Sequence, residues 1–248
     1  MDQLEGRNPV LECLARGRRP VRKIWLDQGA KRDDKIARLL ALASERGVPV
    51  ARVPRAKLDQ MAAGRVHNGV IAEAEPLATL TTLALLDAVF DAGRMPFVLL
   101  ADQVQYEHNL GAILRSALGF GVDGLVVPTR RGASVSPVVQ RVSMGAVEEV
   151  PVVHEGLFAA IKHLKRAGVP IVGADMDGVP LGEARLQGAL ALVMGGEGRG
   201  LSPTLRKHCD AIVSIPLHGG LESLNVSVAA TVLMYEKRRQ DGWYAGRS

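Results

Sequence analysis

Two glycine-containing segments near the end of the chain hold the residues best suited to chemistry. The first, Gly195-Gly-Glu-Gly-Arg-Gly200, directly follows residues 190–194, an apolar run typical of a buried strand. The second, residues 215–230, starts as a loop with two adjacent glycines and becomes apolar and helical from Asn225. Glycine lets a bound molecule approach the backbone closely, because it has no side chain. Both segments are therefore candidates for a ligand site.

The composition of the first segment argues against a phosphate site. No Gly-Lys-Ser/Thr sequence follows it, its spacing differs from the dinucleotide fingerprint, and Glu197 would repel a phosphate. A carboxylate among backbone amides suits a cationic or hydroxyl-rich ligand instead. In the second segment, Ser223 and Asn225 can cap the helix that follows. Taken alone, this segment fits a capped core helix that binds nothing better than it fits a ligand site.

Three stretches together resemble a known family. Residues 192–202, Ile215-Pro-Leu217 and residues 223–229 resemble motifs two and three of the SpoU/TrmH branch of the SPOUT RNA 2′-O-ribose methyltransferases. Residues 102–121, with Asn109-Leu-Gly-Ala-Ile-Leu-Arg-Ser116 inside them, resemble motif one. The motifs occur in the family's order, and the resemblance covers essentially the whole chain. It is closest to the RlmB-like subgroup, which methylates a guanosine of 23S ribosomal RNA.

The resemblance implies an enzyme that transfers the methyl group of S-adenosylmethionine to a ribose 2′-hydroxyl in RNA. It assigns catalytic roles and a cofactor site residue by residue. The catalytic candidates are Arg115, Asn109, Glu197, Ser223 and Asn225, and the cofactor-binding candidates are Gly195, Gly196, Gly198, Ile215, Leu217, Ser223, Leu224 and Asn225. The cysteines and histidines show no metal-ligand spacing, so no metal site is predicted.

Arg115 matches the family residue that activates the hydroxyl. A guanidinium stays protonated up to a pH of about 12, which makes it a poor general base. The alternative is that it binds the adjoining phosphate and stabilises developing alkoxide charge. Glu197 likewise has two possible roles, since it could order its loop or contact the substrate.

Two departures from the family pattern are Tyr106-Glu107, where relatives usually have Asp-Pro, and Met144 in a turn that normally holds a smaller residue.

The elements that must position these residues form an α/β protein. Strands at residues 96–101, 124–127, 150–153, 170–174 and 190–194 are separated by helices, which predicts a mainly parallel sheet with helices on both faces. Residues 110–121 carry a helical apolar stripe, and Asn109 is placed to cap that helix. The resemblance adds a deep trefoil knot that brings the two C-terminal motif loops together.

Three regions are predicted along the chain. Residues 1–76 alternate strands and helices and resemble a substrate-binding domain similar to ribosomal protein L30e; residues 77–95 form a linker with a helix at 81–90; residues 96–248 form the catalytic domain. Residues 1–76 hold 15 Lys+Arg against 10 Asp+Glu, whereas the remainder is balanced. This basic first part suggests contact with a polyanion, here RNA. The candidates for RNA contact are Arg7, Arg18, Arg19, Arg22 and Lys23.

Other features bear on location and assembly. There is no signal-peptide pattern and no apolar run long enough for a membrane span. Cys13 and Cys209 are expected to be reduced thiols in a cytoplasmic protein. Residues 226–234 are apolar nearly all round, so that helix should be buried on several sides. The family forms dimers through this region with the active site at the seam, which predicts a homodimer.

Three alternatives to a 23S ribosomal-RNA enzyme remain. A transfer-RNA or antibiotic-resistance 2′-O-methyltransferase would share the motifs and differ in target. A ribosome-assembly factor that binds RNA without catalysis would keep the first domain and have an inactive pocket, which the intact glycine segments argue against. A nucleotide-dependent oxidoreductase is the most distant, because no dinucleotide fingerprint follows an early strand.

Overall fold

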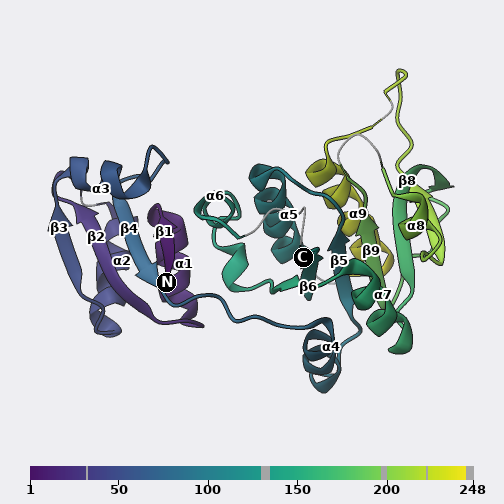
Figure 1. Ribbon diagram of the computed structural model, residues 1–248, viewed down its shortest axis with the longest axis horizontal. Coiled ribbons are helices and arrows are strands. Elements are labelled where there is room, and N and C mark those ends of the chain that lie inside the picture. Colours follow the sequence, from purple (N-terminus) through teal and green to yellow (C-terminus); the bar gives the residue numbers. More distant parts are fainter. Residues whose placement is uncertain (32, 130–134, 197–199, 222, 244–248) are drawn as a thin grey trace. The chain divides into compact units, whose positions relative to one another are not determined.

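The chain, known from a computed structural model, folds into two compact units (Figure 1). The structure describes residues 1–31, 33–129, 135–196, 200–221 and 223–243. One unit contains Met1–Ala78 together with Val135–Glu149, and the other contains Thr79–Ser134 together with Val150–Ser248. Among the described residues, no helix has both the length and the apolar character needed to span a bilayer.

The first unit is built on a four-stranded mixed sheet in the order β1-β4-β2-β3. Strands β1 and β2 run antiparallel to β4, and β3 runs parallel to β2. Helices α1 and α2 bury Leu14 and Leu39 in the larger core, while α3 buries Leu58 against Ile71 in a smaller one. The elements are β1 (Asp2–Glu5), α1 (Arg7–Arg16), β2 (Val21–Asp27), α2 (Asp34–Glu45), β3 (Val50–Val53), α3 (Arg55–Ala62) and β4 (Val70–Ala74).

A later segment of the chain also belongs to this unit. Helix α6 (Pro137–Val142) and the 3-10 helix Ala146–Glu148 group with residues 1–78, whereas the sequence analysis placed them in the catalytic domain. The buried ion pair between Arg19 and Glu148 contributes to this attachment, with a nitrogen–oxygen distance of 2.6 Å and side-chain exposures of 4% and 1%. Residues 129 positions apart form this pair. Periodicity along the chain gives no sign of such a contact.

The second unit contains a six-stranded sheet in the order β10-β8-β9-β5-β6-β7, and every described strand pair in it is parallel. This confirms the predicted parallel α/β architecture. Its strands are β5 (Phe97–Ala101), β6 (Gly124–Val127), β7 (Val152–His154), β8 (Ile171–Pro180), β9 (Leu190–Met194) and β10 (Ala211–Ser214). Its helices are α4 (Thr82–Asp91), α5 (Glu107–Gly119), α7 (Leu157–Arg166), α8 (Pro203–Arg206) and α9 (Val226–Gln240).

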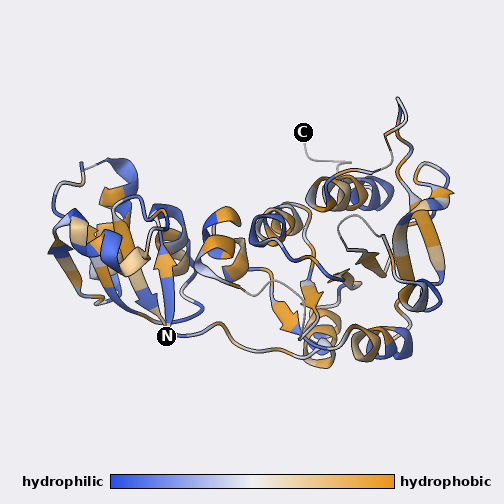
Figure 2. Cartoon of the chain, turned by 45° about the horizontal axis from the view of Figure 1, so that its top comes forward, coloured by the Kyte–Doolittle hydropathy of each residue, from blue (hydrophilic) through white to orange (hydrophobic). Residues whose placement is uncertain are grey.

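Helices cover both faces of this sheet. Leu86 of α4 and Ile161 of α7 pack in one hydrophobic cluster with Val98, Val126 and Val193 of the strands. Helices α5 and α9 contact each other, and the α9 residues Lys237 and Arg238 lie over the ring of Phe97 in β5. Figure 2 shows the strands of this sheet coloured predominantly hydrophobic, as expected for strands covered on both sides.

The pairing of β8 with β10 is interrupted near the middle of β8. Ile212 of β10 pairs with Gly173, but the next residue, Val213, pairs with Val179. Residues 174–178 therefore have no partner on β10 and bulge out of the ladder. This irregularity lies where the pairing of β8 with β9 ends, at Ala174 and Met194, beside the turn that follows β9.

Several local expectations change. Strand β1, helix α8 and strand β10 were not predicted, and β8 is longer than expected. Helix α5 begins at Glu107 with Tyr106 as its N-cap, so the prediction that Asn109 caps this helix is wrong. The helix expected at 81–90 in the linker is α4, and it belongs to the second unit. The trefoil knot stays a prediction of the family resemblance.

Candidate functional site

A cavity of about 870 Å³ lies in the second unit, at the carboxyl ends of β9 and β10 and beside the bulge of β8. Ligands of open parallel α/β sheets characteristically bind at this end of the strands. The first glycine segment, the end of β10 and the start of α9 all contribute to its wall. The described lining residues are Ala174, Asp175, Met176, Pro180, Met194, Gly195, Gly196, Gly200, Val213, Ser214, Ile215, Pro216, Leu217, Leu221, Ser223, Leu224, Asn225, Val226 and Ala229.

The first glycine segment closes on itself at the edge of the cavity. The backbone N–H of Gly196 donates to the carbonyl oxygen of Gly200 at 3.1 Å. A Cβ atom on Gly195 would lie 2.3 Å from the carbonyl carbon of Gly200, so only glycine permits this approach. The cofactor-binding predictions for Gly195 and Gly196 thus fall on the cavity wall. Glu197 and Gly198 lie outside the described residues.

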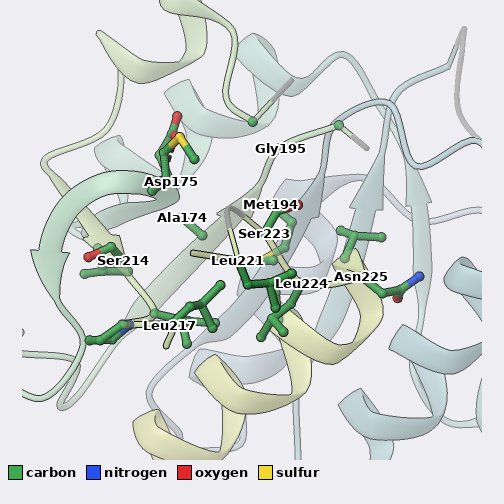
Figure 3. A pocket seen from close by; sticks show the side chains of 18 of the residues that line it. Ala174, Asp175, Met194, Gly195, Ser214, Leu217, Leu221, Ser223, Leu224 and Asn225 are labelled. Atoms are coloured by element: carbon green, nitrogen blue, oxygen red, sulfur yellow. Dashed lines mark hydrogen bonds between the residues drawn. The ribbon is translucent and has the colours of Figure 1, made fainter. Parts of the chain in front are cut away.

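The second segment forms the opposite wall. Figure 3 shows Leu217, Leu221 and Leu224 meeting in the middle of the pocket, with Ser223 close by and Asn225 at the side. All five, together with Ile215, line the cavity. The structure therefore brings together every described residue that the sequence analysis proposed for the cofactor. The apolar leucines provide a surface suited to a flat aromatic group, since burying apolar area against it is favourable.

Asn225 occupies a structural position that the sequence anticipated. Its Oδ1 accepts a hydrogen bond from the backbone N–H of Ser227 at 2.9 Å, which makes it the N-cap of α9. Its Nδ2 donates to Oδ1 of Asn109 on α5 at 3.1 Å. Ser116 and Thr231 form a second contact between the two helices, with their hydroxyl oxygens 2.8 Å apart. The capping amide thus joins the motif-one helix to the start of α9.

Arg115 and Asn109 are not among the described residues that line the cavity. Arg115 is exposed on α5. Asn109 and Arg115 are six positions apart, which at 3.6 residues per turn places their side chains on different sides of the helix. Asn109 contacts the cavity-lining Asn225. In the part of the chain that the structure describes, therefore, the predicted catalytic guanidinium lies outside the wall of the predicted cofactor pocket.

Asp175 lines the cavity and was not predicted from the sequence. Its Oδ2 accepts a hydrogen bond from the backbone N–H of Leu201 at 3.2 Å and lies 3.3 Å from Arg206 Nη1. The same Arg206 nitrogen donates to Asp177 Oδ1 at 2.6 Å, and this hydrogen bond holds the pKa of the Asp177 carboxyl below its ordinary value. The signal in the sequence was its position: Asp175 directly follows residues 170–174, which were predicted as a strand, and ligands bind at the carboxyl ends of such strands.

The RNA-contact candidates lie in the first unit. Arg19 is buried and paired with Glu148, so we no longer count it as a candidate: reaching RNA would require this ion pair to open. The other side chains are more exposed, and each has a neighbour. Arg7 pairs with Asp33, Arg18 pairs with Glu149 at 2.7 Å, Arg22 pairs with Glu75 at 2.6 Å, and Lys23 lies over the ring of Trp25 at 5.2 Å from its centroid.

Two family profiles match the chain, one for each part. The SpoU rRNA Methylase family matches residues 96–235, and the family described as RNA 2′-O ribose methyltransferase substrate binding matches residues 3–80. An uncharacterized tRNA/rRNA methyltransferase of Mycolicibacterium smegmatis is 42% identical over 238 residues, covering 95% of this chain and 75% of that protein. A namesake from Mycolicibacterium vanbaalenii is 41% identical over 239 residues, with 95% and 75% covered.

Solved structures agree with these matches. The SpoU methyltransferase AviRb from Streptomyces viridochromogenes, in complex with the cofactor AdoMet, has a TM-score of 0.79 and 28% identity, covering 99% of this chain and 91% of that one. The TrmH/SpoU tRNA modifying enzyme of A. aeolicus has a TM-score of 0.55 and 25% identity, covering 65% of this chain and 86% of that one. The profile over the second unit and the close relatives together show that the chain belongs to the SpoU family of RNA methyltransferases.

Proposed function

We propose that this protein transfers the methyl group of S-adenosylmethionine to a ribose 2′-hydroxyl of ribosomal RNA, with a guanosine of the 23S molecule as the target. One observation carries the proposal. The two glycine-containing segments, which are separate in the sequence, form opposite walls of one cavity. The match of residues 3–80 to a 2′-O ribose methyltransferase substrate-binding family supports the acceptor group, and the AdoMet-bound relative AviRb supports the donor.

The cavity fits the methyl donor in size and chemistry. Its volume of about 870 Å³ lies within the range of 300–1,000 Å³ that is usual for small-molecule sites. Leu217, Leu221 and Leu224 would enclose the adenine, while Ser223 and the backbone of Gly195 offer polar groups nearby. S-adenosylmethionine supplies an activated methyl group on a sulfonium sulfur. The task left to the protein is to orient the acceptor and stabilise its developing negative charge.

Arg115 is our candidate for that charge stabilisation, in the setting of a homodimer. It is exposed on α5 and lies outside its own subunit's cavity. Large apolar side chains are exposed on the same pair of helices, including Leu118 on α5 and Val228 and Tyr235 on α9. Exposed apolar side chains that gather on neighbouring elements commonly mark a protein interface. Pairing two subunits through α5 and α9 would bring Arg115 of one subunit toward the cavity of the other.

A ribosomal rather than a transfer-RNA target is favoured by the first unit. The tRNA-modifying enzyme of A. aeolicus covers only 65% of this chain, and a structure described as giving insights into 2-OH methylation of C/U34 on tRNA covers 62%. The latter match spans 99% of that chain, so more than a third of the present chain has no counterpart there. The close relatives are named tRNA/rRNA methyltransferases, and a transfer-RNA target is therefore the second candidate.

We also propose a cytoplasmic location, which the two free cysteines, Cys13 and Cys209, fit.

Two measurements test the proposal. Calorimetry with S-adenosylmethionine should show binding to the purified protein, and the absence of binding would favour a non-catalytic assembly factor. Ribose-methylation mapping should then compare ribosomal and transfer RNA from a deletion strain with the same RNAs after incubation with protein and donor. We expect one new 2′-O-methylated guanosine in 23S RNA. A new mark on transfer RNA alone would replace the proposed substrate with the second candidate.

A further inference from the structure

Asp175 is the one ionisable side chain among the described residues that line the cavity. The other lining residues are apolar, glycine or neutral polar, such as Ser214, Ser223 and Asn225. Figure 3 shows the Asp175 carboxylate at the edge of the pocket, apart from the three leucines in its centre. A single charge in such a setting acts more strongly than it would at an open surface, because less water screens it.

The charge of Asp175 is only partly neutralised. Arg206 Nη1 lies 3.3 Å from Asp175 Oδ2 and 2.6 Å from Asp177 Oδ1, so two carboxylates share one guanidinium. The three side chains together carry one net negative charge. Arg206 also approaches Asp177 more closely, and Asp177 is 66% exposed whereas Asp175 is 15% exposed. The positive charge of Arg206 therefore lies closer to the exposed Asp177 than to Asp175. As a result, the edge of the cavity at Asp175 keeps a net negative charge.

The position of this carboxylate is fixed by the backbone on both sides. Oδ1 accepts a hydrogen bond from the N–H of Met176 at 2.8 Å, and Oδ2 accepts from the N–H of Leu201 at 3.2 Å. A Cβ atom at Gly200 would lie 3.0 Å from Oδ1, at a backbone φ of 60°. Asp175 thus ties the bulge of β8 to the end of the first glycine segment. A charge held in this way loses little free energy to reorganisation when a ligand binds.

We propose that Asp175 makes the pocket select the cationic methyl donor over the neutral product of the reaction. This inference rests on the proposed function. S-adenosylmethionine carries a sulfonium, an ammonium and a carboxylate group, and so has one net positive charge. Loss of the methyl group turns the sulfonium into a thioether, and S-adenosylhomocysteine has no net charge. The negative edge of the cavity attracts S-adenosylmethionine more strongly than S-adenosylhomocysteine. This difference promotes release of the product after each turnover.

The test is calorimetry with three ligands: S-adenosylmethionine, S-adenosylhomocysteine and sinefungin, in which a charged amine replaces the sulfonium centre. Asp175→Asn keeps an oxygen for the Leu201 N–H and removes the charge. We expect the preference for S-adenosylmethionine over S-adenosylhomocysteine, taken as the ratio of their Kd values, to fall by at least about fivefold. The affinity for sinefungin should fall in Asp175→Asn as that for S-adenosylmethionine does, because both ligands carry a positive charge at this centre. Asp87→Asn, which makes the same charge change at an exposed position of α4, should leave the ratio unchanged.

Two further measurements keep the inference testable if Asp175→Asn folds poorly. In Arg206→Gln the counter-charge is lost and the carboxylate remains, so the preference should hold or rise. In the wild-type protein, added salt should weaken binding of S-adenosylmethionine more than that of S-adenosylhomocysteine. Equal weakening of both ligands in Asp175→Asn, or equal salt dependence, would overturn the inference while leaving the proposed function standing. A wild-type protein that binds none of the three ligands would instead overturn the proposed function.

Discussion

The side-chain amide of Asn225 donates a hydrogen bond to that of Asn109 across 3.1 Å, although 116 residues separate them in the chain. Asn225 also caps α9 and lines the cavity. The pair therefore couples three features: the motif-one helix, the start of the last helix and the pocket wall. The sequence analysis had given Asn109 a capping role on its own helix, but it lies inside that helix and is available to the neighbouring one.

Asn225→Ala should lose both the cap and the link to α5. Loss of an N-cap costs about 1–2 kcal/mol of the free energy of unfolding, and we expect a decrease of this size in urea denaturation. The affinity for S-adenosylmethionine should fall by about tenfold, because the wall formed by the start of α9 is no longer held in place. Thr231→Val, which removes a contact between the same helices away from the cavity, is the control and should keep donor affinity.

Arg115→Ala should lose turnover while keeping donor affinity, since Arg115 does not line the cavity of its own subunit. Removing one group that stabilises transition-state charge typically costs about 100-fold or more in kcat. Single-turnover methylation of ribosomal RNA and calorimetry with the donor measure the two quantities separately. Arg166→Ala, at an exposed position at the end of α7, provides a matched loss of one positive charge. A wild-type rate in Arg115→Ala would remove this residue from the site.

A shared active site predicts complementation between inactive subunits. Arg115→Ala and Leu224→Arg should each be inactive as homodimers, the first for lack of the guanidinium and the second because the pocket is filled. Mixing equal amounts under conditions of subunit exchange should restore about one quarter of wild-type activity, since half the dimers are mixed and each has one intact site. Failure to regain activity, with exchange verified by mass spectrometry, would place each site within one subunit. A monomer by light scattering at micromolar concentration would also contradict the dimer.

Glu148→Ala should strongly destabilise the first unit. Its carboxylate is 1% exposed and pairs with Arg19, which is 4% exposed. Breaking a buried ion pair costs about 3–5 kcal/mol. We expect a loss near the lower end of this range, because Arg19 keeps the Asp2 carboxylate as a second partner at 2.5 Å. Glu149→Ala is the matched control, because its partners Arg16 and Arg18 are substantially exposed, and pairs of this kind contribute about 1 kcal/mol or less. Similar decreases in the free energy of unfolding in the two variants would show that the buried ion pair stabilises the protein no more than the exposed pairs do.

Cys13 should make stability depend on alkaline pH. Burial, reinforced by the nearby Glu148 carboxylate, raises the pKa of its thiol to about 12 from an ordinary value of 9.0. The folded protein then keeps a proton that the unfolded chain releases, so this stabilisation is complete below pH 9 and declines as pH rises toward 12. Between pH 8 and 10.5, wild-type protein should lose more unfolding free energy than Cys13→Ala. Equal losses would contradict the raised pKa of the thiol.

Local patterns predicted much of this fold. Strands β6 and β9 begin and end where the sequence placed them, because hydrophobic period acts over a few neighbours. Strands β1 and β10 were not predicted from the sequence. Both are four residues long and lie at the edges of their sheets, so pairing with a distant strand defines them more than their own composition does.

The sequence by itself determined the alternation of apolar strands with helices, the two glycine segments and the cap at Asn225, since each of these follows from neighbouring residues. The tertiary structure alone decided that Arg19 is buried, that Asn109 contacts a different helix and that Asp175 lines the cavity. These outcomes depend on which distant segments pack together. Burial and charge pairing are properties of that packing, and spacing along one stretch of chain does not contain them.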